Sequence, residues 1–215
     1  MSDKLYEIVY VPDAKIEIDG RLNEAAWEKA NLLDDFTFPW NDAKAPATHF
    51  RAIVDNEKLY FSYQVWDEDI VLVEPYKHKN DSEGEDRVEV VVSCDRELKR
   101  YFAAEIDGRG RVLDFQSSYH RQFDFSWSWP TLETAGTITD EGYNVEGSIP
   151  LETLESLGLG SLLSGDDLII GLFRAEFSHG PDGETIEDWI SWAQPQVSEP
   201  DFHVPSGFGT ARVVR

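Results

Sequence analysis

Short segments in which apolar and polar side chains alternate recur along this chain, and turn residues separate them. In Leu59–Trp66, apolar side chains occupy every second position, so a β-strand would place them all on one face. The turn Asp55-Asn56 joins this segment to Phe50–Val54, a pattern typical of a hairpin. About ten such segments at hairpin spacing predict an all-β chain folded as an antiparallel β-sandwich of jelly-roll or immunoglobulin-like type. Because the sequence has no internal repeat and no linker, we expect residues 1–215 to form a single domain.

Two short helices are expected between the strands. Asn23 can cap a helix over Glu24–Ala30, and Trp27 would clamp that helix onto the sheet. Pro150 stands at the favoured first position of a second helix, Leu151–Leu157.

The net charge of the chain limits the classes of partner that it can bind. A net charge of −23 disfavours nucleic acid and anionic membranes, which attract basic patches, and it suits neutral ligands and cations. No stretch approaches the roughly 18 apolar residues of a membrane span. The start, Met-Ser-Asp-Lys, does not resemble a signal peptide, so we expect a cytoplasmic protein unless a secretion signal was removed.

The segment Asp86–Cys94 is the most informative about a site. As a strand it would turn four β-favouring side chains toward the core: Val88, Val90, Val92 and Cys94. Cys94, the single cysteine, is therefore expected to be a buried and inert thiol. The opposite face begins with Arg87 and Glu89 and follows a polar loop, which is a common way to build a site on a β scaffold. The alternative is a core strand with a solvated outer face.

Four tryptophans could offer a flat apolar surface to a ligand. Trp127 and Trp129 would lie on one face of a strand and form a platform for a sugar ring, unless both belong to the core. Trp189 and Trp192 are three residues apart, so a strand would turn them to opposite faces. We expect Trp192, at the mouth of a loop, to be the one that faces a ligand.

Acidic clusters suggest a metal site. Asp67, Asp69 and Asp86 could converge on Ca²⁺, which takes six to eight oxygen ligands. The alternative is chance, because the chain holds 42 acidic residues and the spacing is not that of an EF-hand.

The sequence carries no recognisable catalytic motif. It has no Gly-x-Ser-x-Gly, no His-Glu-x-x-His and no phosphate-binding loop, and its five histidines lack metal-ligand spacing. No pair of carboxylates stands out among the many that could lie at the separation a glycosidase needs.

Several motifs together resemble the family 9 carbohydrate-binding modules and their stand-alone relatives. Ile18–Trp27 is close to the opening I-D-G-x-L-x-E-x-x-W, and Asp86–Glu89 is similar to the family's D-x-V-E strand. Gly142–Glu146, with Ile149-Pro150, resembles the strand G-W-x-x-E-x-x-I-P. Three further segments fit in order along the chain: Val54–Phe61, Ser191-Trp192 and Phe208-Gly209.

The resemblance implies a β-sandwich that binds mono- or oligosaccharides without cleaving them, often with bound Ca²⁺, in the context of polysaccharide or xylan-type catabolism. In the family, two tryptophans sandwich the sugar and polar groups near the D-x-V-E strand bind its hydroxyls. Glu89 matches the carboxylate of that motif, with Arg87 as a neighbour, and Trp192 is the match for the second tryptophan. Glu105 and Asp107 stand where the family can present Arg and Asn.

One departure leaves alternatives open. Family members that bind sugar carry a tryptophan shortly before the D-x-V-E motif, and Asn80–Glu85 has none. Trp66, Trp127 or Trp129 could substitute, or the chain could be a scaffold that has lost sugar binding. A module associated with a glycoside hydrolase is a further alternative. A haem domain is disfavoured because the chain has one methionine to offer as an axial ligand.

Overall fold

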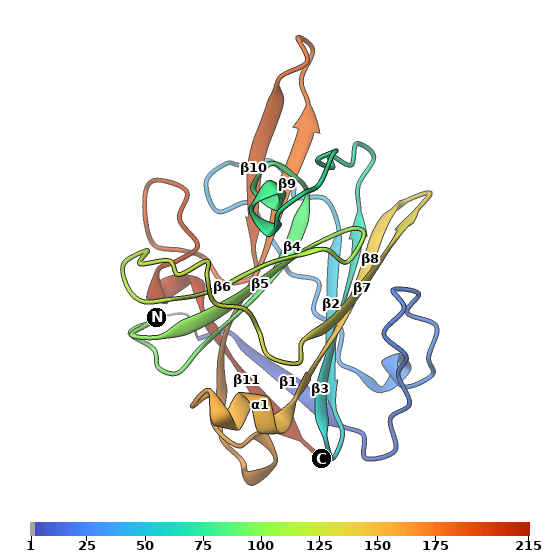
Figure 1. Ribbon diagram of the computed structural model, residues 1–215, viewed down its shortest axis with the longest axis vertical. Helices are drawn as coiled ribbons and strands as arrows, with labels where there is room; N and C mark the ends of the chain where they lie inside the picture. The colour runs from blue at the N-terminus through green and yellow to red at the C-terminus, as the bar shows by residue number, and fades with distance from the viewer. Residues whose placement is uncertain (1–2) are drawn as a thin grey trace.

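The computed structural model describes residues 3–215 and is built mainly from β-strands (Figure 1). Met1 and Ser2, the first two residues of the start Met-Ser-Asp-Lys, lie outside the described residues. The strands are β1 (Leu5–Tyr10), β2 (Thr48–Val54), β3 (Lys58–Trp66), β4 (Arg87–Ser93), β5 (Tyr101–Asp107), β6 (Val112–Ser117), β7 (Glu133–Thr139), β8 (Gly142–Pro150), β9 (Leu168–His179), β10 (Thr185–Ser191) and β11 (Gly209–Val214).

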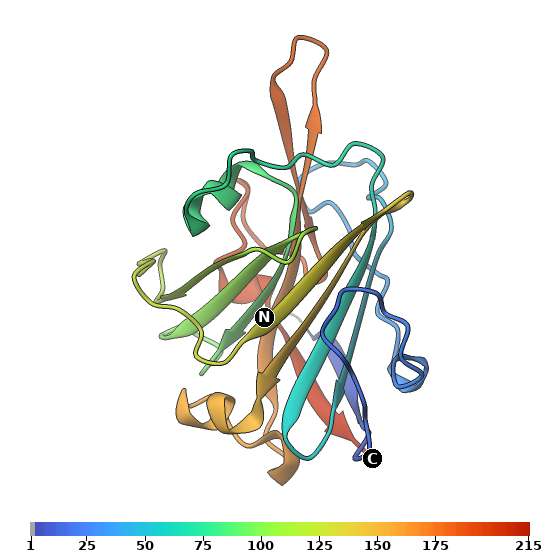
Figure 2. The same cartoon turned by 45° about the vertical axis from the view of Figure 1, so that its right-hand side comes forward.

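The strands form one continuous sheet in the order β6-β5-β4-β9-β11-β1-β2-β3-β8-β7, and β10 pairs with β9. The sheet curls back on itself, so that β4–β6 face β2, β3, β7 and β8 (Figures 1 and 2). Most pairings are antiparallel, as predicted, but β1 pairs in parallel with both β11 and β2. These parallel pairs join what we expected to be two separate sheets, and the sandwich becomes a nearly closed, barrel-like sheet.

Close backbone packing brings the two ends of the sheet together. Gly136 of β7 lies against the turn that links β5 and β6, where a Cβ atom on Gly136 would stand 2.4 Å from the backbone nitrogen of Gly110. Thr134 reinforces this contact, because its hydroxyl donates a hydrogen bond of 2.9 Å to the carbonyl oxygen of Gly110. Glycine is therefore required at position 136 for the β7 edge to approach so closely.

The main core lies inside the curled sheet. As predicted, Val88, Val90 and Val92 of β4 point into it, where they belong to the same buried cluster as Phe61 and Tyr63 of β3. The Tyr63 hydroxyl donates a hydrogen bond of 2.9 Å to the backbone oxygen of Glu89 and so links the two walls.

The outer face of β4, β5 and β9 is not solvated; it carries a second apolar layer. Val91 and Phe173 on this face are fully buried, and the loop residue Phe202 stacks on Phe173 with ring centroids 4.2 Å apart. The chain between β6 and β7 and the chain between β10 and β11 contribute residues to this layer. The face on which we predicted a site is therefore partly roofed.

The helical segments are shorter than predicted. The helix expected over Glu24–Ala30 is a single 3-10 turn, Trp27–Lys29, and the second is α1 (Leu151–Ser156). Further 3-10 turns cover Lys79–Gly84, Leu162–Ser164 and Pro205–Gly207. No helix within residues 3–215 is long and apolar enough to cross a bilayer.

Cys94 differs from the prediction. β4 ends at Ser93, so Cys94 leaves the alternation of the strand, and its side chain is exposed rather than buried in the core.

Candidate functional site

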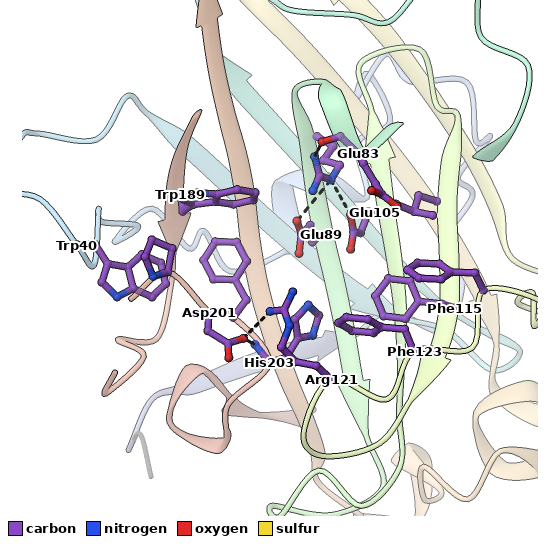
Figure 3. A pocket seen from close by; sticks show the side chains of 15 residues that line it. Trp40, Glu83, Glu89, Glu105, Phe115, Arg121, Phe123, Trp189, Asp201 and His203 are labelled. Atoms are coloured by element: carbon purple, nitrogen blue, oxygen red, sulfur yellow. Dashed lines mark hydrogen bonds and ion pairs between the residues drawn. The ribbon is translucent and has the colours of Figure 1, made fainter. Parts of the chain in front are cut away.

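A cavity of about 410 Å³ opens on the outer face of β4 and β5 (Figure 3). Its floor is polar, with Arg87 and Glu89 from β4 and Glu105 from β5. Its walls are mainly aromatic, and its rim carries charged groups. The wall and rim residues are Trp40, Glu83, Leu113, Phe115, Arg121, Phe123, Phe125, Trp189, Pro200, Asp201, Phe202 and His203.

Strand register builds the floor. Glu89 and Glu105 are direct partners in the antiparallel pair of β4 and β5, so their side chains emerge side by side. Arg87 lies two residues before Glu89 on the same face of β4. Its Nε donates a hydrogen bond of 2.6 Å to Glu105 and lies 3.7 Å from a carboxylate oxygen of Glu89.

The loop before β4 fixes the guanidinium of Arg87. Its Nη1 donates to the backbone oxygens of Ser82, Glu83 and Glu85 at 3.2, 3.3 and 3.1 Å. This loop contains the 3-10 turn Lys79–Gly84, so the polar segment noted in the sequence anchors the floor. Arg87 is therefore held in one position before any ligand arrives.

Glu89 is the least satisfied polar group of the floor. Its side chain is 2% exposed, and within residues 3–215 its carboxylate accepts no hydrogen bond, so the ion pair with Arg87 is its main compensation. Burial raises the pKa of Glu89 well above its usual range, the charge of Glu105 raises it further, and Arg87 opposes both effects. The group lies between Trp189 on one side and Phe115 and Phe123 on the other (Figure 3).

The walls place rings on several sides of the floor. Trp189 of β10 stands nearly perpendicular to Phe177 and to Phe202, at interplanar angles of 89° and 82°. On the far side, Phe123 contacts Phe115 edge-on at a centroid distance of 5.1 Å. Such rings can pack on the apolar face of a small ligand.

Two further groups complete the rim. Arg121 donates to Asp201 at 3.0 Å, and His120 pairs with the same carboxylate at 2.6 Å. His203 is buried under the rings, and burial, aided by the positive charge of Arg121, lowers its pKa to about 3. His203 is therefore neutral near neutral pH.

The structure brings together Arg87, Glu89 and Glu105, as the sequence predicted, but it places Asp107 elsewhere. Asp107 is fully buried at the end of β5, where it accepts the backbone N–H groups of Arg109 and Arg111 at 2.8 and 2.9 Å. It holds the β5–β6 turn and does not line the cavity.

The prediction that Trp192 faces a ligand is wrong. Trp192 is 2% exposed and belongs to the main core. Its backbone N–H donates to the carbonyl oxygen of Leu172 of β9 at 3.1 Å, so it continues alongside β9, and its side chain lies on the inner face with Leu172. Trp189, its alternative on the opposite face, lines the cavity instead. The sequence showed that the two indoles point apart but gave no signal for which one is inside.

The platform expected from Trp127 and Trp129 is also absent. Trp129 is 7% exposed, and its indole N–H donates to the backbone oxygen of Ala103 at 2.9 Å. The two indoles meet at 66°, so they are not coplanar, and Trp127 packs against the core beside Phe102. Both belong to the segment between β6 and β7 and pack that segment onto the main core.

One sequence signal could have indicated the walls: residues 119–129 are rich in aromatic side chains, and Phe123 and Phe125 stand two positions apart. Trp40 and Phe202 reach the cavity from distant loops, and no local pattern marks them.

A second cluster of carboxylates lies apart from the cavity. Oxygens of Asp67, Asp86 and Glu176 lie within 4.8 Å of one another, whereas Asp69 turns outward and pairs with His179 at 2.8 Å. Two of the three predicted metal ligands therefore converge, and Glu176, which we did not predict, replaces Asp69. Arg174 forms ion pairs with Asp67 and with Glu176.

Comparison with known proteins gives the chain its family. The model of the carbohydrate family 9 binding domain-like family matches residues 18–215, and no curated protein matches the chain. A candidate carbohydrate-binding protein from Bacteroides uniformis superposes with a TM-score of 0.75 at 17% identity, over 98% of this chain and 99% of the other.

Two structures of a family 9 carbohydrate-binding module from Caldicellulosiruptor kristjanssonii share the fold. The complex with cellotriose has a TM-score of 0.66 at 14% identity, over 98% of this chain and 93% of the other. The complex with glucose has a TM-score of 0.63 at 15% identity, over 98% and 96%. Together with the match to 198 of 215 residues (positions 18–215), these findings show that the chain belongs to the carbohydrate family 9 binding domain-like family.

Proposed function

We propose that this protein binds carbohydrate in the cavity over β4 and β5 and does not cleave it. The observation that carries the proposal is Glu89, a buried carboxylate that accepts no hydrogen bond from residues 3–215 and lies beneath aromatic walls. A sugar offers what this cavity lacks, since its hydroxyls donate hydrogen bonds and its ring faces are apolar. Family membership supports the proposal, as do the relatives whose structures hold cellotriose and glucose.

Different residues of the cavity stack on the sugar ring and bind its hydroxyls. The Trp189 indole packs against one face of the ring, replacing the tryptophan that Asn80–Glu85 lacks. A ring hydroxyl donates to Glu89, and Arg87 keeps Glu105 in register beside it. We infer no hydrolysis, and we place the binding in polysaccharide or xylan-type catabolism, with the chain as a partner of enzymes that cleave the polymer.

The experiment is a calorimetric titration with glucose, xylose, cellobiose and xylobiose. Single-site sugar binding of this kind falls near the millimolar range, about −4 kcal/mol. We expect Trp189→Ala to weaken binding about tenfold or more, because it removes the stacking surface. Trp66→Ala is the matched control, since Trp66 is a half-buried indole outside the cavity. Equal affinities in Trp189→Ala and the parent protein would contradict the assignment.

We also propose Ca²⁺ at the cluster of Asp67, Asp86 and Glu176. Burial raises the pKa of Asp86 to about 7 and that of Glu176 to about 8, so a bound cation would replace protons here. When all three carboxylates are ionised, the single guanidinium of Arg174 leaves two negative charges, which one Ca²⁺ would neutralise. Asp67 Oδ2 is buried and accepts no hydrogen bond from the part of the chain that the structure describes, which fits an oxygen aimed at a cation.

The metal proposal is tested by thermal unfolding in Ca²⁺ and in EDTA. Ca²⁺ is expected to raise the melting temperature of the parent protein above its value in EDTA. The melting temperature of Glu176→Gln should be the same in Ca²⁺ and in EDTA. Asp69→Asn is the control, because Asp69 lies outside the cluster, and it should respond like the parent. No response of the parent to Ca²⁺ would exclude the site.

A further inference from the structure

We propose that the cavity over β4 and β5 selects a sugar that carries a protonated amine, an amino sugar, over a neutral sugar of the same shape. This inference rests on the proposed carbohydrate binding and names the class of sugar. It is carried by the charge of the floor, by the fixed position of Arg87 and by the rings around them.

The charge count of the lining is negative. Four carboxylates line the cavity, those of Glu83, Glu89, Glu105 and Asp201, against the two guanidinium groups of Arg87 and Arg121. Arg121 is committed to Asp201 at the rim, at 3.0 Å. With both carboxylates ionised, the floor holds Glu89 and Glu105 against one guanidinium, which leaves one negative charge for a cationic ligand to balance. The raised pKa of Glu89, to which the charge of Glu105 contributes, reflects this excess when no cation is bound.

Arg87 cannot neutralise both floor carboxylates. Its Nε is bonded to Glu105 at 2.6 Å, and its Nη1 is held by three backbone oxygens of the preceding loop. The distance of 3.7 Å to Glu89 is too long for a hydrogen bond. Glu89 is thus the group with spare charge and spare acceptor capacity, and it faces the cavity.

A neutral sugar would satisfy only part of this need. A hydroxyl can donate one hydrogen bond to Glu89 but brings no positive charge, so beside a neutral sugar Glu89 either shares Arg87 with Glu105 or takes up a proton. Both states cost free energy, because a buried carboxylate is favourable only when its charge is balanced. An ammonium group supplies both the hydrogen bond and the counterion, in the stronger charge-assisted form.

The walls favour an organic cation over a metal ion. Ca²⁺ needs six to eight oxygen ligands, whereas most of the wall consists of aromatic rings. The faces of these rings attract cations, and two guanidinium groups already lie over them: Arg87 is 5.8 Å from the Trp189 ring centroid and Arg121 is 5.2 Å from that of Phe123. A ring that carries an amine would place apolar faces on the walls and its charge on the floor.

The test is calorimetric titration of the full chain with glucose, glucosamine and N-acetylglucosamine at about pH 6.5, where the free amine is protonated. We expect glucosamine to bind about tenfold or more tightly than the other two, because N-acetylation keeps the nitrogen but removes its charge. Glucosamine binding no tighter than glucose overturns this inference while the proposed function stands. If none of the three binds while xylose, cellobiose or xylobiose does, this inference alone is overturned. If no sugar of either panel binds, both are overturned.

Glu89→Gln keeps the shape of the side chain and removes its charge. In this variant the ratio of the glucose and glucosamine Kd values should fall to within about twofold of one. Glu184→Gln is the control for net charge, because Glu184 is exposed on the hairpin between β9 and β10, away from the cavity, and there the parent ratio should persist. A tenfold preference retained in Glu89→Gln would contradict the role of Glu89; if that variant binds none of the three sugars, the ratio in the parent protein decides.

Discussion

At the scale of single residues, Glu146 explains why distant parts of the family motif occur together. Its carboxylate accepts hydrogen bonds from the Trp27 indole at 2.9 Å and from the backbone N–H groups of Asp19 and Gly20 at 3.1 and 2.7 Å. The opening I-D-G motif and the later strand motif are thus two halves of one buried contact. The family motif near the N-terminus of the chain therefore stabilises the fold and does not line the cavity.

Glu146→Ala should therefore destabilise the fold. It leaves three donors without their acceptor, and we expect a loss of about 2–4 kcal/mol in the free energy of unfolding. Urea denaturation measures this loss. Glu141→Ala, at an exposed turn, is the control and should cost less than about 0.5 kcal/mol. A similar cost for both variants would show that the Glu146 contact contributes nothing.

The buried His203 makes the free energy of unfolding depend on pH. Its pKa in the folded state is lowered to about 3, whereas an unfolded histidine titrates near 6.5. As the pH falls below about 6.5 the unfolded chain gains a proton that the folded chain does not bind. The folded state therefore loses up to about 1.4 kcal/mol per pH unit from this residue, down to about pH 3.

Replacing the imidazole by a ring that cannot be charged isolates this effect. As the pH falls from about 6.5 to about 4, the free energy of unfolding of His203→Phe should increasingly exceed that of the parent protein. Urea unfolding at several pH values measures this difference. Phenylalanine suits the position, because His203 packs against the rings of Tyr101 and Phe123 and its Nδ1 has no hydrogen-bond partner within residues 3–215. Parallel stability curves would contradict the buried, neutral state of His203.

The residues of the site were predictable to the extent that strand alternation decides them. Arg87 and Glu89 share a face because they are two apart in a strand, and that prediction is confirmed. Trp192 was misplaced because alternation gives relative directions and does not say which side of β10 is covered. That side is set by the pairing of β10 with β9, a contact that the local sequence does not contain.

At the scale of elements, β4 is buried on both faces. All seven of its residues are buried, although its sequence alternates like a strand with one solvated face. The outer face is covered by residues that follow β6 and β10, far along the chain, so the pattern alone could not predict the cover. The same cover forms the walls of the cavity.

Val91→Ala tests whether this outer layer is packed like a core. Val91 is fully buried in the outer cluster, so we expect a loss of about 1–3 kcal/mol in unfolding free energy. The matched control is Ile186→Ala on β10, where the side chain is 44% exposed and the change should stay within about 0.5 kcal/mol. A neutral Val91→Ala would mean that the outer face is loosely covered.

At the scale of the whole molecule, the two ends of the chain join the halves of the sheet in its middle, and the edges of the sheet meet where β7 contacts the β5–β6 turn. β1 and β11 pair in parallel over Leu5–Val9, and Gly136 brings β7 against the β5–β6 turn. The sequence predicted the strands and their hairpins, which are local, but not the parallel pairs. The pair of β1 and β11 joins segments some two hundred residues apart, and the pair of β1 and β2 joins segments 44 residues apart, as Val9 with Ile53. Closure matters for the site, because β9, between β4 and β11, positions β10 and with it Trp189.

The central claim is that a sugar enters the cavity beside Trp189, and NMR of the indole N–H groups tests it most directly. The chain has seven tryptophans, so the titration of a sugar follows seven indole signals, assigned by single Trp→Phe variants. The account predicts that Trp189 and Trp40, which line the cavity, shift in a saturable way, while the buried Trp192 and Trp129 do not. A saturable shift at Trp66 or Trp27 with Trp189 unmoved would place the sugar elsewhere and contradict the account.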